Sequence, residues 1–503
     1  MKAGLAAAAL LAAFVLQSVL ALPQLTPSFD EHSHLPAGYT YWKTRDLRLN
    51  PQHPPLVKLL AAAPLLALQP RVDWTDPSWA AANEWRFGHV FFYEWGNDLD
   101  RMLLWARLPI VGLALLLGLC VFRWSSERFG LKGGLLSLLL YAFCPTVIAH
   151  SRFVTMDVAL AAFLTFALYH LWRYTQGGRR SDLVLCAVSL GLALATKFSA
   201  PVIVPVVIAF VVLKAKRVGP PALVLAVAAL VLWAAYLFGD PMQYVNGLRR
   251  VNQDHPAEHR YFLLGQYRAG GFWYYFAAAF LMKTPIPTLV ALAAAAIHAW
   301  RTRATTGRDD LVLLVPAAVF FAATSIWAHN LGVRYLLPAY PLLFIFAGRL
   351  AEPLAAHRAG RVVGGVLAMW LVARGVTTHP DQLAYFNEAT GGPALGYRRL
   401  DDSNVDWIQD LKRLKAFLDA KGIGPVNVCM HMRGNPPYYG IQAEPVEPQQ
   451  LVGDPAPGHY AISAHCLSRI REYNADAGRE LDWMERFPLV GRVGWSFYVF
   501  QIR

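Results

Sequence analysis

Long apolar runs, each close to the length of a membrane-spanning helix, constrain this chain more than any other feature of its sequence. A helix needs about 20 predominantly apolar residues to cross the hydrocarbon core of a bilayer. Such runs recur from the N-terminus to residue 377, and the chain is 56% hydrophobic with a mean hydropathy of +0.34. Because only 16% of the residues are charged, an ordinary soluble enzyme is excluded. The sequence therefore predicts an α-helical polytopic membrane protein.

We expect about eleven spanning helices, of which the fifth and sixth are short and meet at Lys197. The expected spans are 3–22, 102–122, 133–150, 154–172, 183–196, 199–213, 220–238, 271–299, 311–329, 334–350 and 361–377. The first run also has features of a signal peptide, with Val19-Leu20-Ala21 as an acceptable cleavage site. Its length favours a retained helix.

The net charge of +13 is distributed in a way that argues against nucleic-acid binding. Lys and Arg gather in short gaps between apolar runs, and in alternate gaps they outnumber the acidic residues. Because cytoplasmic loops carry an excess of Lys and Arg, the pattern predicts a cytoplasmic N-terminus. Three longer segments, 23–101, 239–270 and 378–503, then lie outside the cytoplasm. We divide the chain into a membrane domain, 1–377, and an extracytoplasmic C-terminal domain, 378–503.

The C-terminal domain has the pattern of a small α/β fold. Helical periodicity over 405–418 is followed by short β-rich runs at 426–429, 460–462 and 495–500. Two of the five cysteines, Cys429 and Cys466, lie in this domain. They form a disulfide only if the domain faces an oxidising compartment and the two sulfurs lie close together, and the spacing does not decide this.

An acidic pair, Asp30-Glu31, follows the first apolar run at the predicted outer edge of the membrane. A carboxylate there can accept the proton of an acceptor hydroxyl, and two neighbouring acids can divide catalysis and positioning between them. The alternative is two solvated loop acids. Asp30, His32, His34 and His53 also raise a divalent-metal cluster, but their spacing matches no metal signature, so no metal or other cofactor is expected.

Basic side chains near the same edge are candidates for binding a lipid phosphate. His53 precedes Pro54-Pro55, which fix the local backbone, and Lys58 follows them. Arg334 lies at the outer mouth between two expected spans. A leaving phosphate gains negative charge and needs cationic or N–H donors. The simpler interpretation of each residue is a headgroup contact or a snorkelling side chain.

Ionisable residues within or beside the predicted spans are candidates for lining a substrate cavity. Asp157 lies inside a span, where it either serves a site or forms a structural pair with Arg152. Lys283 lies in an apolar run beside Pro285, which interrupts the helix. His255 lies in the second outer segment. We therefore treat Asp157, Lys283 and His255 as cavity candidates.

Together these motifs resemble the GT-C superfamily, and within it the bacterial relatives of the protein O-mannosyltransferase and aminoarabinose transferase group (glycosyltransferase family 39). The resemblance rests on Asp30-Glu31, the His-Pro-Pro-Leu segment at 53–56, Arg152 with Asp157, and the Arg-Tyr-Leu-Leu-Pro segment at 334–338. It covers residues 1–377, and the segment 400–412 is also similar to one in bacterial members. One departure is Gln52-His53, where aminoarabinose transferases tend to have Glu-Lys before Pro-Pro.

The resemblance implies a GT-C fold and a multi-pass glycosyltransferase of the bacterial inner membrane. It implies inverting transfer of a sugar from a polyprenyl-phosphate-sugar donor to an acceptor hydroxyl outside the cytoplasm. The acceptor is a protein, lipid A or another envelope glycan. By this analogy Asp30 matches the catalytic carboxylate with Glu31 beside it, and Arg152 and the His53 region match positions near the lipid phosphate.

Two other classes of function compete with this interpretation. A transporter or flippase of a lipid-linked sugar needs ionisable residues at mid-membrane and inverted structural halves. A non-catalytic scaffold would bind a partner through the outer domain and would leave the Asp30-Glu31 pair and His53 without a role. The enzyme hypothesis accounts for the acidic, imidazole and basic groups at one membrane edge. Its partners are the lipid-linked donor, a protein or glycolipid acceptor and the bilayer.

Overall fold

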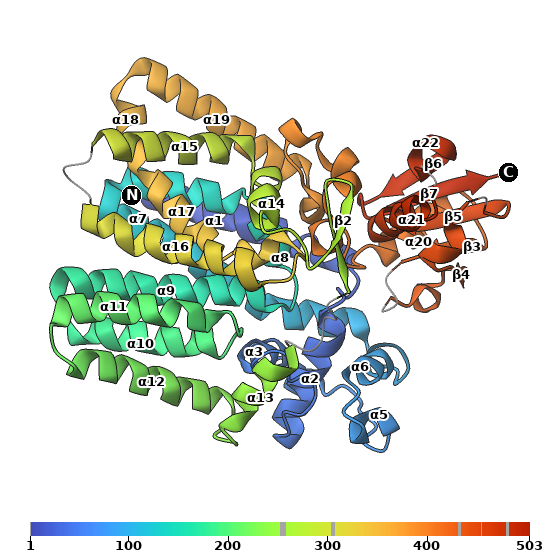
Figure 1. Ribbon diagram of the computed structural model, residues 1–503, viewed down its shortest axis with the longest axis horizontal. Coiled ribbons are helices and arrows are strands. Elements are labelled where there is room, and N and C mark those ends of the chain that lie inside the picture. Colours follow the sequence, from blue (N-terminus) through green and yellow to red (C-terminus); the bar gives the residue numbers. More distant parts are fainter. Residues whose placement is uncertain (1, 252–257, 303–306, 431–433, 454, 479–481) are drawn as a thin grey trace.

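A helical bundle forms one end of the molecule and a sheet domain forms the other (Figure 1). The computed structural model describes residues 2–251, 258–302, 307–430, 434–453, 455–478 and 482–503, so the cavity candidate His255 lies outside the described residues. The mostly helical architecture with a small C-terminal α/β domain confirms the predicted fold class.

Each expected span coincides with one helix or with consecutive helical segments. The bundle contains α1 (Lys2–Val19), α7 (Leu99–Ala142), α8 (Pro145–His150), α9 (Met156–Gly177), α10 (Arg180–Leu194), α11 (Val204–Ala215), α12 (Gly219–Ala235), α14 (Tyr275–Lys283), α15 (Ile286–Arg301), α16 (Gly307–Trp327), α17 (Ala339–Ala347), α18 (Ala351–Ala356) and α19 (Arg358–Thr377). The helix α7 is kinked at Phe129 and Gly130, where the backbone leaves the helical region, so it supplies two of the expected spans.

Fewer of the described helices are long and apolar enough to cross a membrane than the sequence predicts. In the described part of the chain, four helices are long and apolar enough to cross a membrane: α1, α7, α16 and α19. The pair α14 and α15, which is bent by 113° at the break between the two helices, raises the number to five if it counts as one span. The count of about eleven spans therefore stays a prediction.

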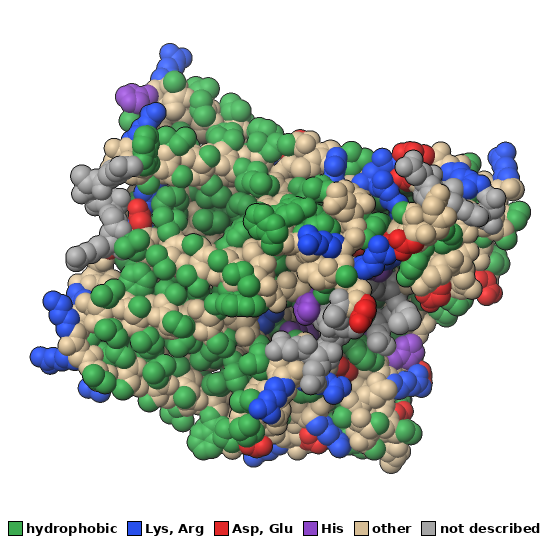
Figure 2. Space-filling model, viewed as in Figure 1, with side chains coloured by type: hydrophobic (Ala, Val, Ile, Leu, Met, Phe, Trp, Pro, Cys, Tyr) green, Lys and Arg blue, Asp and Glu red, His purple; other side chains and the backbone are tan. Residues whose placement is uncertain are grey.

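Hydrophobic side chains cover the surface of the helical end (Figure 2). Charged side chains gather over the sheet domain and at the tip of the bundle farthest from that domain. Leu116, Leu213 and Val362 are 54%, 73% and 60% exposed on the bundle. Soluble proteins rarely expose so large an apolar surface to water, whereas lipid tails solvate one readily. The chain is therefore a multi-pass membrane protein.

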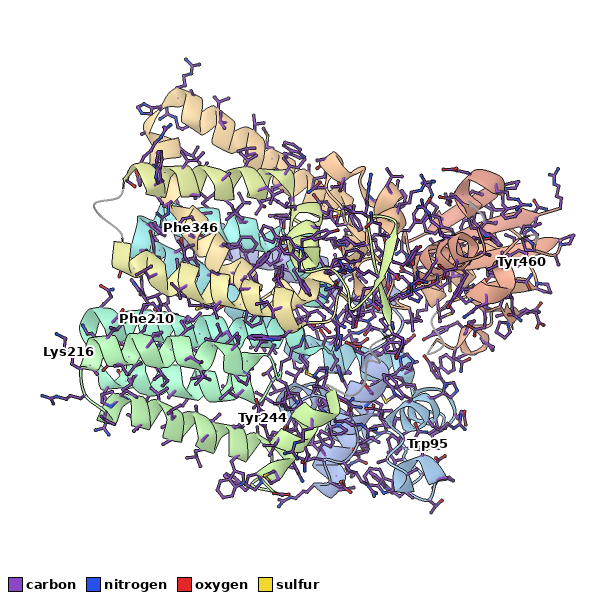
Figure 3. All side chains as sticks on the ribbon, in the orientation of Figure 1. Trp95, Phe210, Lys216, Tyr244, Phe346 and Tyr460 are labelled. Carbon is purple, nitrogen blue, oxygen red and sulfur yellow. The ribbon has the colours of Figure 1, made fainter. Side chains whose placement is uncertain are left out.

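The three segments predicted outside the cytoplasm gather at one end of the molecule. Figure 3 shows Trp95, from the first segment, and Tyr460, from the C-terminal domain, at the end opposite Lys216. The first segment folds into α2 (Glu31–Thr44), α3 (Leu56–Ala62), α4 (Leu65–Leu68), α5 (Pro77–Ala80) and α6 (Glu84–Tyr93). The second contains α13 (Met242–Val251) and the hairpin β1 (Arg260–Leu263) and β2 (Gln266–Ala269). The direction of the bundle across the membrane stays a prediction.

The C-terminal domain is a five-stranded mixed sheet with strand order β4-β3-β5-β7-β6. Its elements are α20 (Leu411–Ala420), β3 (Val426–Cys429), β4 (Ala443–Pro445), β5 (Gly458–Ser463), α21 (Ala464–Asp476), α22 (Trp483–Arg486), β6 (Leu489–Val493) and β7 (Phe497–Ile502). The strand β3 runs parallel to β4 and β5, and β7 runs antiparallel to β5 and β6. Cys429 and Cys466 are free buried thiols.

The helix expected over 405–418 begins only at Leu411, so the first part of that prediction is wrong. Residues 402–404 form a short 3-10 turn, and Ile408 has a φ of 70°. The Asp406 carboxylate accepts the Ile408 N–H at 3.0 Å, and the Gln409 amide oxygen accepts the Trp407 N–H at 2.6 Å. These local side-chain hydrogen bonds replace the helical backbone pattern despite the apolar periodicity.

Candidate active site

Asp30 and Glu31 begin α2, and Glu31 anchors that helix to the bundle. Its side chain is fully buried and accepts hydrogen bonds from Arg107 Nε at 2.9 Å and Nη2 at 2.7 Å. The backbone N–H groups of Ser28 and Val154 donate to the same carboxylate at 2.8 and 2.9 Å. Burial by itself would raise the pKa of Glu31, but Arg107 and these hydrogen bonds hold it below its ordinary value. Glu31 is thus an ionised structural anchor.

Asp30 turns the other way and joins a row of alternating charges. The Arg334 Nη1 atom lies 2.6 Å from Asp30 Oδ2 and 3.5 Å from Asp157 Oδ2. The other Asp157 oxygen pairs with Lys197 Nζ at 2.6 Å. The Lys197 ammonium also lies 4.0 Å from the centre of the Tyr335 ring. Four separate parts of the chain therefore place two carboxylates and two cations side by side.

A cavity of about 1170 Å³ opens beside this charged row. Its walls come from the segment 23–101, the ends of the bundle helices nearest the sheet domain, the 329–335 turn and the C-terminal domain. Four of the catalytic, phosphate-binding and cavity candidates line it, namely Asp30, His53, Asp157 and Arg334, and so does His34. Their convergence is what the hypothesis of a single outer site requires.

His53 lies in the cavity wall with an unused ring nitrogen. Its ring packs edge-on against His34, with 5.3 Å between the ring centres, and His34 in turn contacts the Val154 carbonyl at 2.9 Å. Within the described residues, His53 Nδ1 has no hydrogen-bond partner. Burial, followed by the nearby His34 and Lys197, lowers the pKa of His53 well below its ordinary value. A neutral imidazole can donate to a phosphate or accept from a hydroxyl.

The structure places Lys58 behind the cavity wall, so its predicted contact with the lipid phosphate is not supported. Its ammonium donates to the His53 carbonyl at 2.8 Å, to Asn50 Oδ1 at 3.1 Å and to the Tyr41 hydroxyl at 3.0 Å. Burial lowers the pKa of Lys58 to about 7. Lys58 therefore shapes the loop that carries His53.

Arg152 and Lys283 are also engaged by backbone carbonyls away from the cavity lining. Arg152 donates to the Pro380 carbonyl at 3.1 Å. Lys283 donates to the Leu383 carbonyl at 2.7 Å and to that of Asn404. Both side chains tie the bundle to the segment after α19. The predictions that Arg152 contacts the phosphate and that Lys283 lines the cavity are therefore not supported. Of the two alternatives for Asp157, the structural pair with Arg152 does not form, because Asp157 pairs with Lys197 instead.

The histidines near Asp30 do not form a metal-binding group in this arrangement. Both ring nitrogens of His32 are engaged, one with the Ser28 carbonyl and one with the Tyr93 hydroxyl, each at 2.9 Å. Across the described ranges, no three His, Cys, Asp or Glu side chains gather in a way that could hold a metal ion. Metal dependence itself stays untested.

Lys197, Asp402 and Trp407 are among the cavity residues that were not site candidates. The Trp407 ring lies 4.4 Å from the Arg334 guanidinium, where it supports the cation from the C-terminal side. The sequence feature that could have identified Lys197 as a site residue was its position as a cation between two short apolar runs. For Asp402 and Trp407 it was the segment 400–412, which was noted only for its similarity to bacterial family members, and Trp407 was also included in the expected helix 405–418.

The fold and a segment of the sequence have counterparts among known proteins. Residues 98–238 match the model of the dolichyl-phosphate-mannose-protein mannosyltransferase family. ArnT from Cupriavidus metallidurans bound to undecaprenyl phosphate has the same fold, with a TM-score of 0.50, 15% identity, and coverage of 98% of this chain and 97% of that chain. Apo ArnT gives a TM-score of 0.51 with the same identity and coverage. No curated protein matches the sequence. The chain thus shares the fold of ArnT over nearly its whole length, and residues 98–238 are similar to the mannosyltransferase family, in keeping with the resemblance that the sequence motifs suggested.

Proposed function

We propose that this protein transfers a sugar from a polyprenyl-phosphate-sugar donor to an acceptor hydroxyl on the outer face of a bacterial inner membrane. The observation that carries the proposal is the Asp30 carboxylate, which faces a large cavity at the end of an apolar bundle, beside Arg334 and Lys197. The fold shared with ArnT, which binds undecaprenyl phosphate, supports a lipid-linked donor.

Asp30 is the general base of the proposed reaction. It accepts the proton of the acceptor hydroxyl while the hydroxyl oxygen attacks the anomeric carbon of the donor sugar. The bond between that carbon and the phosphate oxygen breaks, and the lipid phosphate leaves with the electron pair. Because attack comes from the face opposite the leaving group, the anomeric configuration inverts. Glu31 takes no part in proton transfer, because Arg107 and two backbone N–H groups occupy its carboxylate.

Arg334, Lys197 and His53 receive the donor phosphate in this proposal. The phosphodiester gains a second negative charge as the sugar leaves, so cations and N–H donors at its oxygens stabilise the transition state. A phosphate beside Arg334 competes with Asp30 for the guanidinium, which now lies 2.6 Å from the carboxylate. Donor binding then frees Asp30 to act as a base only when the leaving group is in place.

Mass spectrometry of envelope glycolipids and glycoproteins tests the proposal without knowledge of the acceptor. Cells lacking the protein should lose a specific sugar modification, and the wild-type chain should restore it. Asp30→Asn should reach the membrane normally and fail to restore it, because loss of a general base lowers rates by about 10²–10⁴-fold. The matched control is Asp419→Asn, which removes a carboxylate that is 60% exposed and pairs with Lys415. Full restoration by Asp30→Asn would refute the base role.

The flippase alternative gains no support from the buried ionisable residues. Asp157 and Lys197 pair with each other beside the cavity, and Lys283 is engaged by two carbonyl oxygens. Of these residues, only the first two line the cavity. They therefore do not outline a continuous polar path through the described bundle.

A further inference from the structure

We propose that Asp402 binds a hydroxyl group of the donor sugar and thereby contributes to the choice of sugar. The inference rests on the proposed function and adds a specificity-determining residue to the site. Asp402 begins a short 3-10 turn (Asp402–Asn404) between the bundle and the sheet domain. It lines the same cavity as Asp30 and Arg334.

The turn at 401–404 is fixed against the turn at 331–334, which carries the guanidinium of the charged row. The Ser403 hydroxyl donates to the Leu331 carbonyl at 2.7 Å. The two turns approach so closely at Gly332 that a Cβ atom there would lie 2.2 Å from Ser403 Oγ. The carboxylate and the guanidinium are thus held by one packed unit, which is the preorganisation that a binding site requires.

The backbone of Asp402 adopts a left-handed conformation, with a φ of 57°. Such a conformation costs a non-glycine residue on the order of 1 kcal/mol and persists where surrounding contacts enforce it. Here the Asp401 carboxylate accepts the Asp402 N–H at 2.7 Å. Asp401 is itself held by His465 Nδ1 at 2.8 Å and by Arg469 at 3.3 Å. These contacts hold the left-handed backbone of Asp402 in place in the wall of the cavity.

Asp401 and Asp402 differ in how much of their hydrogen-bonding capacity the protein uses. Asp401 Oδ1 accepts from the Asp402 N–H and contacts His465, and its other oxygen pairs with Arg469 at 3.3 Å, whereas among the described residues Asp402 accepts from the Ser403 N–H at 2.6 Å. Burial raises the pKa of Asp402 to about 6, although the Arg334 guanidinium opposes this rise. Asp402 lines the cavity, and an ionised carboxylate there accepts strong hydrogen bonds from hydroxyl donors.

The charges around Asp402 favour a sugar hydroxyl over a phosphate as its ligand. Arg334 pairs with Asp30 and lies 3.5 Å from Asp157, and the charge of Asp402 also acts on it. A phosphate placed directly on Asp402 would meet like charge, whereas a hydroxyl is neutral and donates. In the proposed reaction Arg334 contacts the donor phosphate. The sugar attached to that phosphate then lies within a few ångströms of Arg334, close to Asp402.

Binding of a lipid phosphate and of its sugar-carrying forms to the full-length protein in nanodiscs tests this inference. The probes are undecaprenyl phosphate and the same lipid carrying mannose, glucose or aminoarabinose. Asp402→Gly keeps the left-handed backbone without strain and removes the carboxylate, and Asp402→Asn removes its charge. The affinity gained from the sugar is the ratio of the dissociation constants for the lipid without and with the sugar. We expect this ratio to be about 10-fold or more smaller in Asp402→Gly than in the wild-type protein, which is the effect of one charge-assisted hydrogen bond. The dissociation constant of Asp402→Gly for undecaprenyl phosphate should stay within about twofold of the wild-type value.

The outcomes separate this inference from the proposed function. If the wild-type protein binds neither the lipid phosphate nor a sugar-carrying form, the proposed function fails, and the inference fails with it. If the wild-type protein gains affinity from a sugar and both Asp402 variants retain that gain, only the inference is overturned. Equal weakening for the lipid phosphate and its sugar-carrying forms would also overturn it, because that result indicates a structural role. Asp419→Asn is the matched control and should change neither constant.

Discussion

The two neighbouring acids provide the sharpest test of the structural argument. We expect Glu31→Gln to destabilise the protein strongly, and Asp30→Asn to abolish transfer with little effect on stability. Both substitutions replace a carboxylate with an amide, and they affect adjacent residues. They differ only in what surrounds each carboxylate, because Glu31 is fully buried against Arg107 whereas the Asp30 side chain is 16% exposed beside the cavity.

The magnitude follows from the four hydrogen bonds that Glu31 accepts. Each of its oxygens accepts one N–H from Arg107 and one from the backbone. In either orientation a glutamine amide presents an NH₂ group to one of these pairs, and the charge of Arg107 stays buried. Removing one partner of a buried ion pair costs about 3–5 kcal/mol. An Asn at position 30 still offers Arg334 an amide oxygen, and Asp157 stays 3.5 Å away, so its expected cost is about 1 kcal/mol.

Thermal unfolding of the purified protein in one detergent, paired with restoration of the envelope modification, measures both effects. A double-mutant cycle combines Glu31→Gln with Arg107→Met. We expect Arg107→Met alone to be destabilising, and the double variant to lose less stability than the two single losses combined, because both buried charges are then removed together.

A specific result would refute this reasoning. If Glu31→Gln melts at the wild-type temperature and loses transfer, while Asp30→Asn restores the envelope modification, then Glu31 is the reactive carboxylate. An additive double variant would instead show that Glu31 and Arg107 are not energetically coupled. Either outcome would contradict the division of roles between the two acids.

Two further predictions concern the turn that carries Asp402. Gly332→Ala should lower the melting temperature because the new Cβ would lie 2.2 Å from Ser403 Oγ, and Ser403→Ala in the same chain should recover most of the loss by removing that atom. Burial lowers the pKa of His465, but Asp401 raises it more, so the folded value lies above the ordinary 6.5. The stabilisation from protonated His465 should therefore be complete below about pH 6.5 and disappear as the pH rises through the folded value. Melting curves between about pH 6 and 9 should show a wild-type advantage over His465→Gln that shrinks with increasing pH, and a constant advantage would contradict the assignment.

The helical architecture could be predicted from the sequence because a bilayer leaves few alternatives. Backbone polar groups cannot remain unpaired in hydrocarbon, so a long apolar run must form a helix whatever its neighbours are. The runs that produce α7, α9 and α19 therefore predicted their positions closely. The periodicity over 405–418 carried no such constraint, because that segment lies outside the bundle. There the side chains of Asp406 and Gln409 determined the local backbone.

The sequence by itself determined that charge gathers at one edge of the membrane, and it singled out Asp30-Glu31 within that charge. It did not determine which carboxylate faces the cavity. That division depends on Arg107, which lies 76 residues from Glu31, and on Arg334, which lies 304 residues from Asp30. Likewise, only the tertiary structure engages Lys58, Arg152 and Lys283 with backbone carbonyls and leaves Lys197 at the cavity. The physical reason is that membrane insertion depends on local hydrophobicity, whereas a site depends on which distant helices pack together.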